Sequence, residues 1–137
     1  MKQNTANEEV SKSKLWTGRV LSGVAVIFLI FDGTIHLLKP GPVIESFNHL
    51  GYSPDISVTL GIIELFCLAI YLIPQTSIFG AVLLTGYLGG AVASQLRIGE
   101  PLFGYVLFPV YIGILLWGGI YLRDRKLQSI IPFRKGE

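Results

Sequence analysis

Two ionisable residues, Asp32 and His36, lie four residues apart within a long apolar stretch that begins near Thr17. On an α-helix this spacing places both side chains on one face, where they can form a charge-assisted pair. If the stretch crosses a membrane, both groups lie where charge is costly, and residues of this kind face the interior of a bundle and mark functional sites. The pair therefore predicts a polar site inside a helical bundle.

Polar residues of other apolar stretches are expected at a similar depth. With a rise of 1.5 Å per residue, Asp32 lies about 9 Å from the outer end of its helix and Glu64 about 12 Å from the same end of the next one. The same count places Tyr87 about 14 Å deep and Tyr111 about 10 Å deep. The polar groups thus gather in the outer half of the bilayer, and the inner half is expected to be nearly featureless. The candidate ligand-binding or proton-relay residues are Asp32, His36, Glu64, Tyr87, Gln95, Arg97 and Tyr111.

Such a cluster can do two kinds of chemistry. A buried carboxylate is driven towards its neutral form unless a cation lies nearby, so Glu64 could share a proton with the Asp32–His36 pair or pair with Arg97. The cluster could then relay protons, or it could bind the polar head of a hydrophobic molecule such as a quinone. The alternative is that these residues only hold helices together by satisfying one another.

Metal and cofactor sites have weaker support in the sequence. Asp32, His36 and Glu64 could supply three ligands, but the chain has no HExxH motif and no paired histidines, so no metal site is predicted. The chain also lacks a nucleotide-binding loop, a cysteine pair and a G-x-S-x-G motif. Redox chemistry would therefore need an external cofactor or partner, with a bound quinone as the expected one.

The composition indicates a membrane protein. The chain has 137 residues, of which 51% are hydrophobic and only 15% are charged, against about 25% charged residues in an average soluble domain. A net charge of +2 without basic runs that alternate with aromatic residues excludes nucleic acid as a partner. The single cysteine, Cys67, is predicted to be a small core residue.

Four stretches approach the 20 or so apolar residues that a spanning helix needs. They cover residues 17–38, 56–73, 77–96 and 104–122, with a kink expected at Pro109. Between the first two, residues 42–50 form an amphipathic segment that lies either in the membrane interface over the mouth of the bundle or on an ordinary surface. The expected fold is an all-α integral membrane four-helix bundle with this short interfacial helix between helices 1 and 2.

The faces that pack together are predicted from helical periodicity. Small and polar residues hold helices together in lipid, so the faces that carry them are expected to point inward. The third span has two neighbouring faces, a small-residue packing face of Gly86, Gly90 and Ser94 and beside it a face of Tyr87, Ala91 and Gln95. The faces of the other spans are Gly18, Ser22, Ala25, Leu29, Asp32 and His36 in the first, Ser57, Gly61, Glu64, Leu68 and Tyr71 in the second, and Gly104, Phe108, Tyr111, Leu115 and Gly118 in the fourth.

The orientation follows from the positive charges. Of the eleven Lys and Arg residues, nine lie before or at the start of the first span or after the fourth, and only Lys39 and Arg97 lie at the other face. Both termini are therefore predicted to be cytoplasmic, in a multi-pass protein of the inner (plasma) membrane. The predicted organisation is a disordered cytoplasmic tail at 1–14, a transmembrane domain at 15–131 and a cytoplasmic tail at 132–137.

Several short motifs also resemble a known family. FDGTIHLLKP at 31–40, GIIEL at 61–65, TGYLGGAVA at 85–93 and RIGEP at 97–101, with shorter matches at 50–52 and 72–74, are similar in order and spacing to the DoxX-like family of small four-helix membrane proteins. The resemblance covers about residues 17–131.

The resemblance implies roles for particular residues. Glu64 corresponds to the family's characteristic glutamate in the second helix, and residues 86–93 with Arg97 correspond to its third-helix signature. His36 stands where relatives often have Lys, and Gln95 stands where they have His. Both changes keep the site polar, and the first replaces a fixed cation with a titratable one.

The family also implies a functional setting. It is named after a membrane subunit of an archaeal thiosulfate:quinone oxidoreductase, and other members are linked to oxidative-stress and quinone- or catechol-responsive systems. The expected function is a component of a membrane redox or stress-response system, an accessory subunit rather than a stand-alone enzyme. Its expected partners are membrane lipid, a redox partner protein and further copies of the chain. The alternatives are a non-catalytic binder of a lipid-like ligand and a scaffold subunit of a membrane complex.

Overall fold

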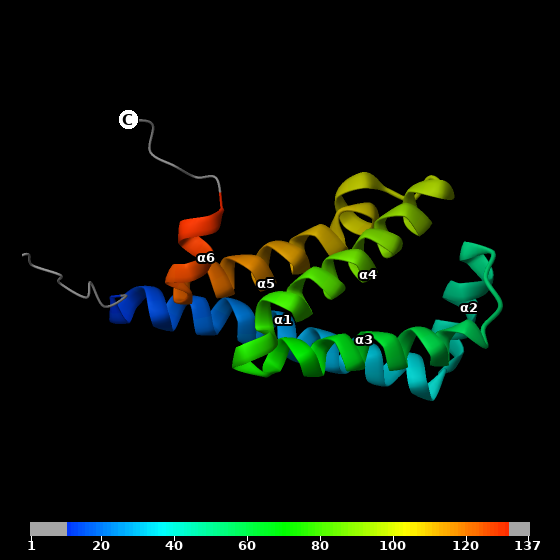
Figure 1. Ribbon diagram of the computed structural model, residues 1–137. Coiled ribbons are helices and arrows are strands. Elements are labelled where there is room, and N and C mark those ends of the chain that lie inside the picture. The colour runs from blue at the N-terminus through cyan, green and yellow to red at the C-terminus, as the bar shows by residue number, and fades with distance from the viewer. Residues whose placement is uncertain (1–10, 132–137) are drawn as a thin grey trace, which may run out of the picture.

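The computed structural model describes residues 11–131, which are mostly helical and contain no strand (Figure 1). The predicted tails at 1–10 and 132–137 lie outside the described residues. In chain order the elements are α1 (Lys12–Leu38), α2 (Gly41–Leu50), α3 (Ile56–Leu72), the 3₁₀ turn η1 (Pro74–Thr76), α4 (Ser77–Arg97), the π-helical turn η2 (Leu102–Val106), α5 (Phe108–Arg123) and α6 (Arg125–Ile130).

Local signals explain where the first two helices begin and end. The Ser11 side chain accepts a hydrogen bond of 3.3 Å from the backbone N–H of Lys14 and caps the helix. The helix therefore begins at Lys12, three residues before the predicted start of the transmembrane domain at residue 15. α1 ends where Lys39 adopts a left-handed φ of 46°, and α2 ends at Gly51 with a φ of 78°.

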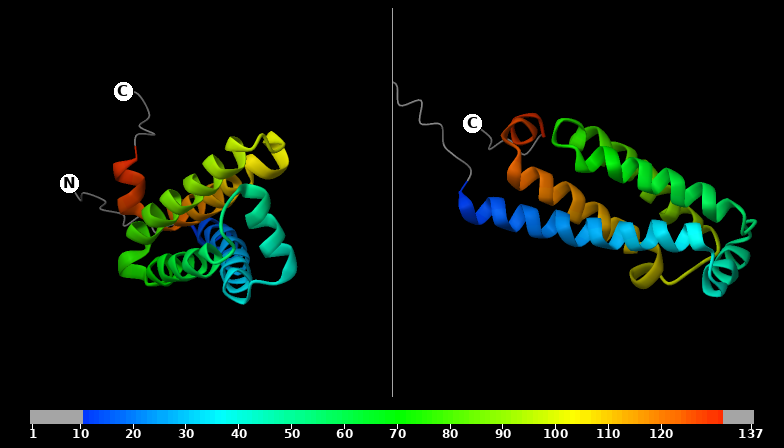
Figure 2. Two further views of the ribbon diagram at one scale, coloured as in Figure 1. Left: turned by 90° about the vertical axis from the view of Figure 1, so that its right-hand side faces the viewer. Right: turned by 90° about the horizontal axis from the view of Figure 1, so that it is seen from below.

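Four helices form an antiparallel bundle. α1 packs against α3 and α5, and α4 packs against the same two helices, so α1 and α4 lie on opposite corners. Figure 1 shows α3 and α4 close together near η1 and diverging towards α2, which lies across the far end of the bundle. Figure 2 shows that α1 begins and α6 ends at the opposite end. We call these the α2 end and the terminal end.

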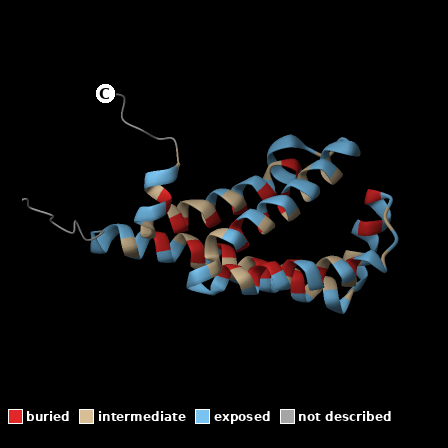
Figure 3. Cartoon of the chain, viewed as in Figure 1, coloured by how far each residue is buried: buried red, intermediate tan, exposed pale blue. Residues whose placement is uncertain are grey.

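The outside of the bundle suits a lipid environment. α1 and the segments Pro74–Arg97 and Leu102–Arg123 are long and apolar enough to cross a membrane, whereas α3 has 17 residues. A helix of that length spans about 26 Å, somewhat less than the 30 Å or so of a hydrocarbon core. Large apolar side chains such as Ile27, Phe66 and Ile114 are exposed on the outside. Figure 3 shows the buried residues facing the bundle axis and the exposed ones facing outward.

Close helix contacts depend on glycine at two places. A Cβ atom at Gly61 of α3 would lie 2.8 Å from the carbonyl oxygen of Gly33 in α1. A Cβ atom at Gly119 of α5 would lie 2.0 Å from the Ser22 hydroxyl and 2.9 Å from the Gly18 carbonyl oxygen, both in α1. Small residues thus let α1 approach α3 near the α2 end and α5 near the terminal end, as is usual in membrane bundles.

The predicted packing faces of the first two spans are confirmed. All five residues that were predicted for α3 are buried, and so are the first four of the six that were predicted for α1. The other two, Asp32 and His36, are half-buried. Cys67 is also buried, as predicted. Asp32 and His36 in α1 and Glu64 in α3 lie on these faces, and these ionisable residues were sufficient to identify the inner ones.

The predicted small-residue packing face of the third span and the predicted face of the fourth span are wrong, whereas Tyr87, Ala91 and Gln95 of the third span line the cavity described below. A Cβ atom at Gly86 or Gly90 would have no neighbour within 4 Å, because these glycines face open space. The buried residues of α4 are instead Gly80, Ala81, Leu84 and Leu88. In α5 the buried residues are Pro109, Ile112, Leu116, Gly119 and Ile120. α5 is apolar on all sides, so its periodicity carries no contrast between faces.

Pro109 also plays a different part from the one expected. It lies in the first turn of α5, where its missing N–H has no helical partner to lose. The break in the segment falls before it, between η2 and α5 at Leu107.

Candidate functional site

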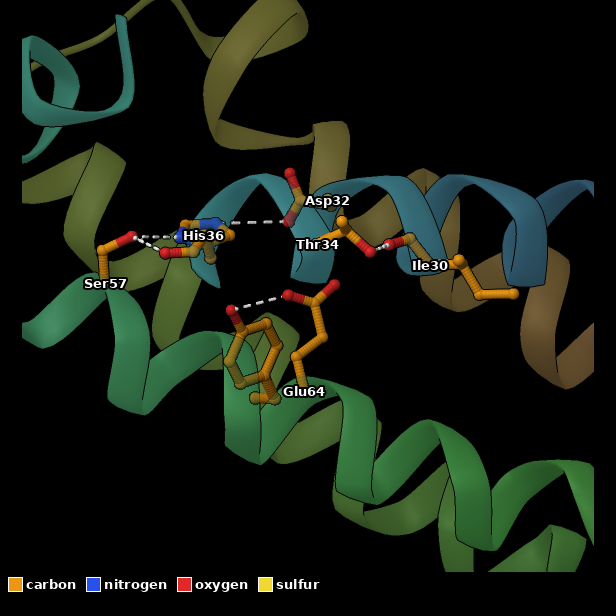
Figure 4. A network of polar contacts seen from close by, with 7 residues as sticks. Ile30, Asp32, Thr34, His36, Ser57 and Glu64 are labelled. Carbon is orange, nitrogen blue, oxygen red and sulfur yellow. Dashed lines mark hydrogen bonds and ion pairs between the residues drawn. The ribbon is translucent and has the colours of Figure 1, made fainter. Parts of the chain in front are cut away.

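Asp32 and His36 form the predicted pair on α1, and a serine of α3 orients the ring (Figure 4). His36 Nε2 lies 3.4 Å from Asp32 Oδ2. The Ser57 hydroxyl donates to the backbone oxygen of His36 at 2.8 Å, and His36 Nδ1 lies 3.1 Å from the same Ser57 oxygen. Because the single Ser57 proton is used by the carbonyl, Nδ1 is the donor in this contact. Nε2 is therefore the ring nitrogen that faces the carboxylate of Asp32.

Glu64 completes the cluster from α3. Its side chain is fully buried, and its Oε2 accepts a hydrogen bond of 3.0 Å from the Tyr87 hydroxyl of α4. Among the fully buried side-chain oxygen and nitrogen atoms of residues 11–131, only Glu64 Oε1 has no hydrogen-bond partner. One ligand atom each from Asp32, His36 and Glu64 lies within 4.8 Å of the other two. The close approach of α3 to α1 at Gly61 brings these three side chains together.

A cavity of about 970 Å³ adjoins this cluster. It lies towards the α2 end and is bordered by residues of α1, α2, α3, α4 and α5. Its wall is mostly apolar, with polar side chains at a few points. The polar lining residues are Asp32, His36, Ser46, Tyr52, Tyr87, Ser94, Gln95 and Arg97. Glu64 does not line the cavity. It lies directly behind Asp32 and Tyr87, which do line it.

The cavity is open on the side between α3 and α4. Gly86 and Gly90 border it on α4, and each has open space where a side chain would begin. Ile56 and Ile63 border it on α3, and both are exposed. A ligand in the cavity could therefore extend an apolar chain outward between these two helices.

The short helix α2 covers the mouth of the cavity. The ring of its buried residue Phe47 lies 5.4 Å from the His36 ring. The Arg97 guanidinium donates to the backbone oxygen of Leu50 and lies 5.5 Å from the Tyr52 ring. The Tyr52 hydroxyl lies 2.8 Å from the Ser94 hydroxyl. These contacts confirm the predicted helix at 42–50 and its place over the mouth.

Six of the seven predicted site residues lie around this cavity. Asp32, His36, Glu64 and Tyr87 form the cluster at its inner wall, and Gln95 and Arg97 line it nearer the mouth. The exception is Tyr111, which is 41% exposed, does not line the cavity and donates to the backbone oxygen of Phe103 at 3.0 Å. Its placement in the site was wrong because the inner face of α5 was misjudged.

Two further residues, Ser57 and Tyr52, contribute to the site and were not among the predicted site residues. Ser57 was placed on the buried face of α3 but was not recognised as the group that orients His36. Its position seven residues before Glu64 on the same face is the signal that could have found it. Tyr52 lies in a loop, and its contact with Ser94 has no periodic signal.

A second polar cluster occupies the terminal end, where a nearly featureless interior was predicted. The Tyr71 hydroxyl lies 2.8 Å from the Ser22 hydroxyl and donates to the backbone oxygen of Leu116 at 3.0 Å. Arg123 donates to the Ser22 hydroxyl at 3.0 Å and to the Gly119 backbone oxygen at 2.9 Å. The expectation was wrong because Arg123 reaches back into the bundle from the end of α5.

A comparison with models of protein families identifies the family of this chain. The model of the DoxX-like family matches residues 20–119, which is more than half of the chain. The chain belongs to the DoxX-like family. The matched region of this DoxX-like protein includes the whole Asp32–His36–Glu64 cluster, Tyr87 and Arg97. Together with the apolar helices, the family identifies an integral membrane protein. Neither the curated proteins nor the solved structures gave a match.

Proposed function

We propose that this DoxX-like protein binds a hydrophobic small molecule with a polar head, such as a quinone, in the cavity at the α2 end. The observation that carries the proposal is the cavity of about 970 Å³, whose apolar wall ends at a buried polar cluster. Ligand pockets in proteins have volumes of about 300–1,000 Å³ and combine apolar walls with a few placed polar groups. The cavity meets both criteria.

The polar groups suit a head with hydrogen-bond acceptors. A quinone carries two carbonyl oxygens, so its site needs donors. Arg97 offers guanidinium N–H groups beyond the one that binds the Leu50 carbonyl, and Gln95 offers its amide. At the inner wall, His36 and Tyr87 line the cavity with groups that can hold a proton. The head would lie between these two sets, and the tail would leave between α3 and α4.

The chain's own part in redox chemistry is to bind and position. None of the described side chains can carry electrons alone, so a quinone would exchange them with a separate redox protein. The proposed role is therefore that of an accessory component of a membrane redox or stress-response system. Nine of the eleven Lys and Arg residues precede or open the first span or follow the fourth in the sequence, and only Lys39 and Arg97 lie between the spans, which supports cytoplasmic termini in an inner (plasma) membrane and a cavity in the outer half.

A mutation that places a larger side chain in the cavity tests the proposal. We expect Gly90→Leu to weaken the binding of a short-chain ubiquinone to the purified protein in nanodiscs at least about tenfold, since its side chain would occupy the cavity. Gly89→Leu is the matched control, because Gly89 also has open space around it but does not line the cavity. Absence of saturable binding to the native protein, or equal binding by both variants, would count against the proposal.

A lipid-like ligand without redox chemistry is the second candidate. The opening between Gly90 of α4 and Ile63 of α3 favours it, because an acyl chain could enter there directly from the bilayer. Native mass spectrometry of the detergent-extracted protein separates the two, since it would reveal a co-purified lipid or a quinone by its mass. It would also show whether the chain assembles with further copies.

A further inference from the structure

We propose that Asp32, His36 and Glu64 bind a divalent transition-metal ion such as Zn²⁺. The three side chains come from two helices and present one ligand atom each within 4.8 Å of the others. Imidazole and carboxylate groups are established ligands of Zn²⁺ and of related first-row ions. The site would consist of protein side chains alone, so it does not depend on the proposed quinone.

The distances approach those of a metal site. Ligand atoms around a tetrahedral ion with bonds of 2.0–2.2 Å lie about 3.4 Å apart. The distance between His36 Nε2 and Asp32 Oδ2 already has this value, 3.4 Å. The Glu64 carboxylate must shorten a distance of up to 4.8 Å to about 3.4 Å, which is a movement of up to about 1.4 Å at the end of a long side chain.

The hydrogen bonds of His36 also suit a ligand. Metal-binding histidines donate the N–H of their second ring nitrogen to a neighbouring acceptor, which fixes the ring and frees the other nitrogen for the metal. Here Nδ1 donates to the Ser57 oxygen, and Nε2 points to the carboxylate of Asp32 (Figure 4). A neutral His36 would place an acceptor nitrogen against an acceptor oxygen. A cation between the two would remove this conflict.

The buried carboxylate of Glu64 adds a second observation. Its Oε1 is fully buried without a hydrogen-bond partner among the described residues, and a buried polar atom without a partner is costly. A cation held by this carboxylate would offset that cost, and two carboxylates would balance the double charge of the ion within the bundle. Asp32 and His36 line the cavity, so a coordination position would remain open towards it.

No local sequence motif marks this site, because Glu64 joins the Asp32–His36 pair only through the contact of α3 with α1. The chain offers a matched control in a second histidine–carboxylate pair. His49 Nε2 lies 2.5 Å from Glu100 Oε1, and the His49 side chain is exposed outside the cavity.

The test uses the purified full-length protein in nanodiscs, stripped with a chelator and titrated with Zn²⁺ alone. We expect one ion per chain by calorimetry and by elemental analysis after desalting. Asp32→Asn, His36→Gln and Glu64→Gln should each weaken binding more than about tenfold, and Ser57→Ala should weaken it about tenfold through the ring orientation. His49→Gln should bind within twofold of the native protein.

A Co²⁺ titration adds a spectroscopic readout, since a tetrahedral site with a nitrogen ligand gives visible absorption that the ligand variants should lose. Asp32→Asn keeps the shape of the side chain, so it remains informative if another variant fails to fold. The proposal is wrong if Zn²⁺ does not bind saturably, if all three ligand variants bind normally, or if His49→Gln removes the binding. Repeating the ubiquinone titration with chelator present separates failure of this site from failure of quinone binding.

Discussion

The two polar clusters of the bundle are built from similar parts and differ in how completely they are satisfied. At the terminal end, Ser22, Tyr71 and Arg123 bond to one another and to backbone oxygens. At the α2 end, Glu64 keeps one oxygen without a partner, and Asp32 and His36 face a cavity. The first cluster has what interhelical contacts require, and the second retains the capacity to bind something else.

Helix spacing accounts for the difference. Near the terminal end α1 and α5 are so close that Gly119 has no room for a Cβ atom beside Ser22. Near the α2 end α3 and α4 diverge, and Gly86 and Gly90 face open space. Glycine thus allows close helix contact at the terminal end and lines an opening at the α2 end.

The largest effect is expected from a mutation that separates the helices at the terminal end. Gly119→Ala should lower the free energy of unfolding by about 1–3 kcal/mol, because the new methyl group would overlap the Ser22 hydroxyl and the Gly18 backbone. Unfolding of the protein in mixed micelles by a denaturing detergent measures the change. Gly23→Ala serves as the control, since Gly23 has open space around it. Equal stability of the two variants would contradict the close contact.

A smaller effect is expected from removing one hydroxyl of the terminal cluster. Tyr71→Phe should lower the free energy of unfolding by about 1–2 kcal/mol, because the buried Leu116 oxygen would lose its donor. Ligand binding by the folded fraction should not change, since neither residue lines the cavity. A loss of ubiquinone affinity in this variant would show that the two clusters are not independent.

The smallest effect is expected at α2, the short helix that covers the mouth of the cavity. Tyr52→Phe removes the contact with the Ser94 hydroxyl and leaves the ring against Arg97 and Phe47. Global stability should change by less than about 1 kcal/mol. Hydrogen–deuterium exchange of residues 41–52 should become faster, because α2 is held over the mouth by few contacts. Unchanged exchange would mean that α2 is fixed mainly by Phe47 and Leu50.

The sequence predicted most of the fold and about half of the packing detail. The helices, including α2, followed from apolar length and periodicity, and the inner faces of α1 and α3 were predictable because Asp32 and His36 in α1 and Glu64 in α3 mark them. The inner face of α5 and the role of Tyr111 were not, because apolar residues surround that helix. The cavity was also not predictable, since it arises from the divergence of α3 and α4 rather than from any residue pattern. The cluster at the terminal end joins Ser22 of α1, Tyr71 of α3 and Arg123 of α5. The residue spacing within a single helix cannot reveal such a contact.

We propose that the cluster at the α2 end is a ligand site and not a structural contact between helices. The most direct test measures the ubiquinone affinity and the free energy of unfolding of the native protein and of Glu64→Gln on the same nanodisc preparations. We expect the variant to lose at least about tenfold in affinity, because it removes a group that can hold a proton directly behind Asp32 and Tyr87, which line the cavity. Its free energy of unfolding should change by less than about 1 kcal/mol, because the amide oxygen of glutamine can still accept the hydrogen bond from Tyr87. Unchanged affinity together with a large loss of stability would contradict the claim and make Glu64 a contact between helices.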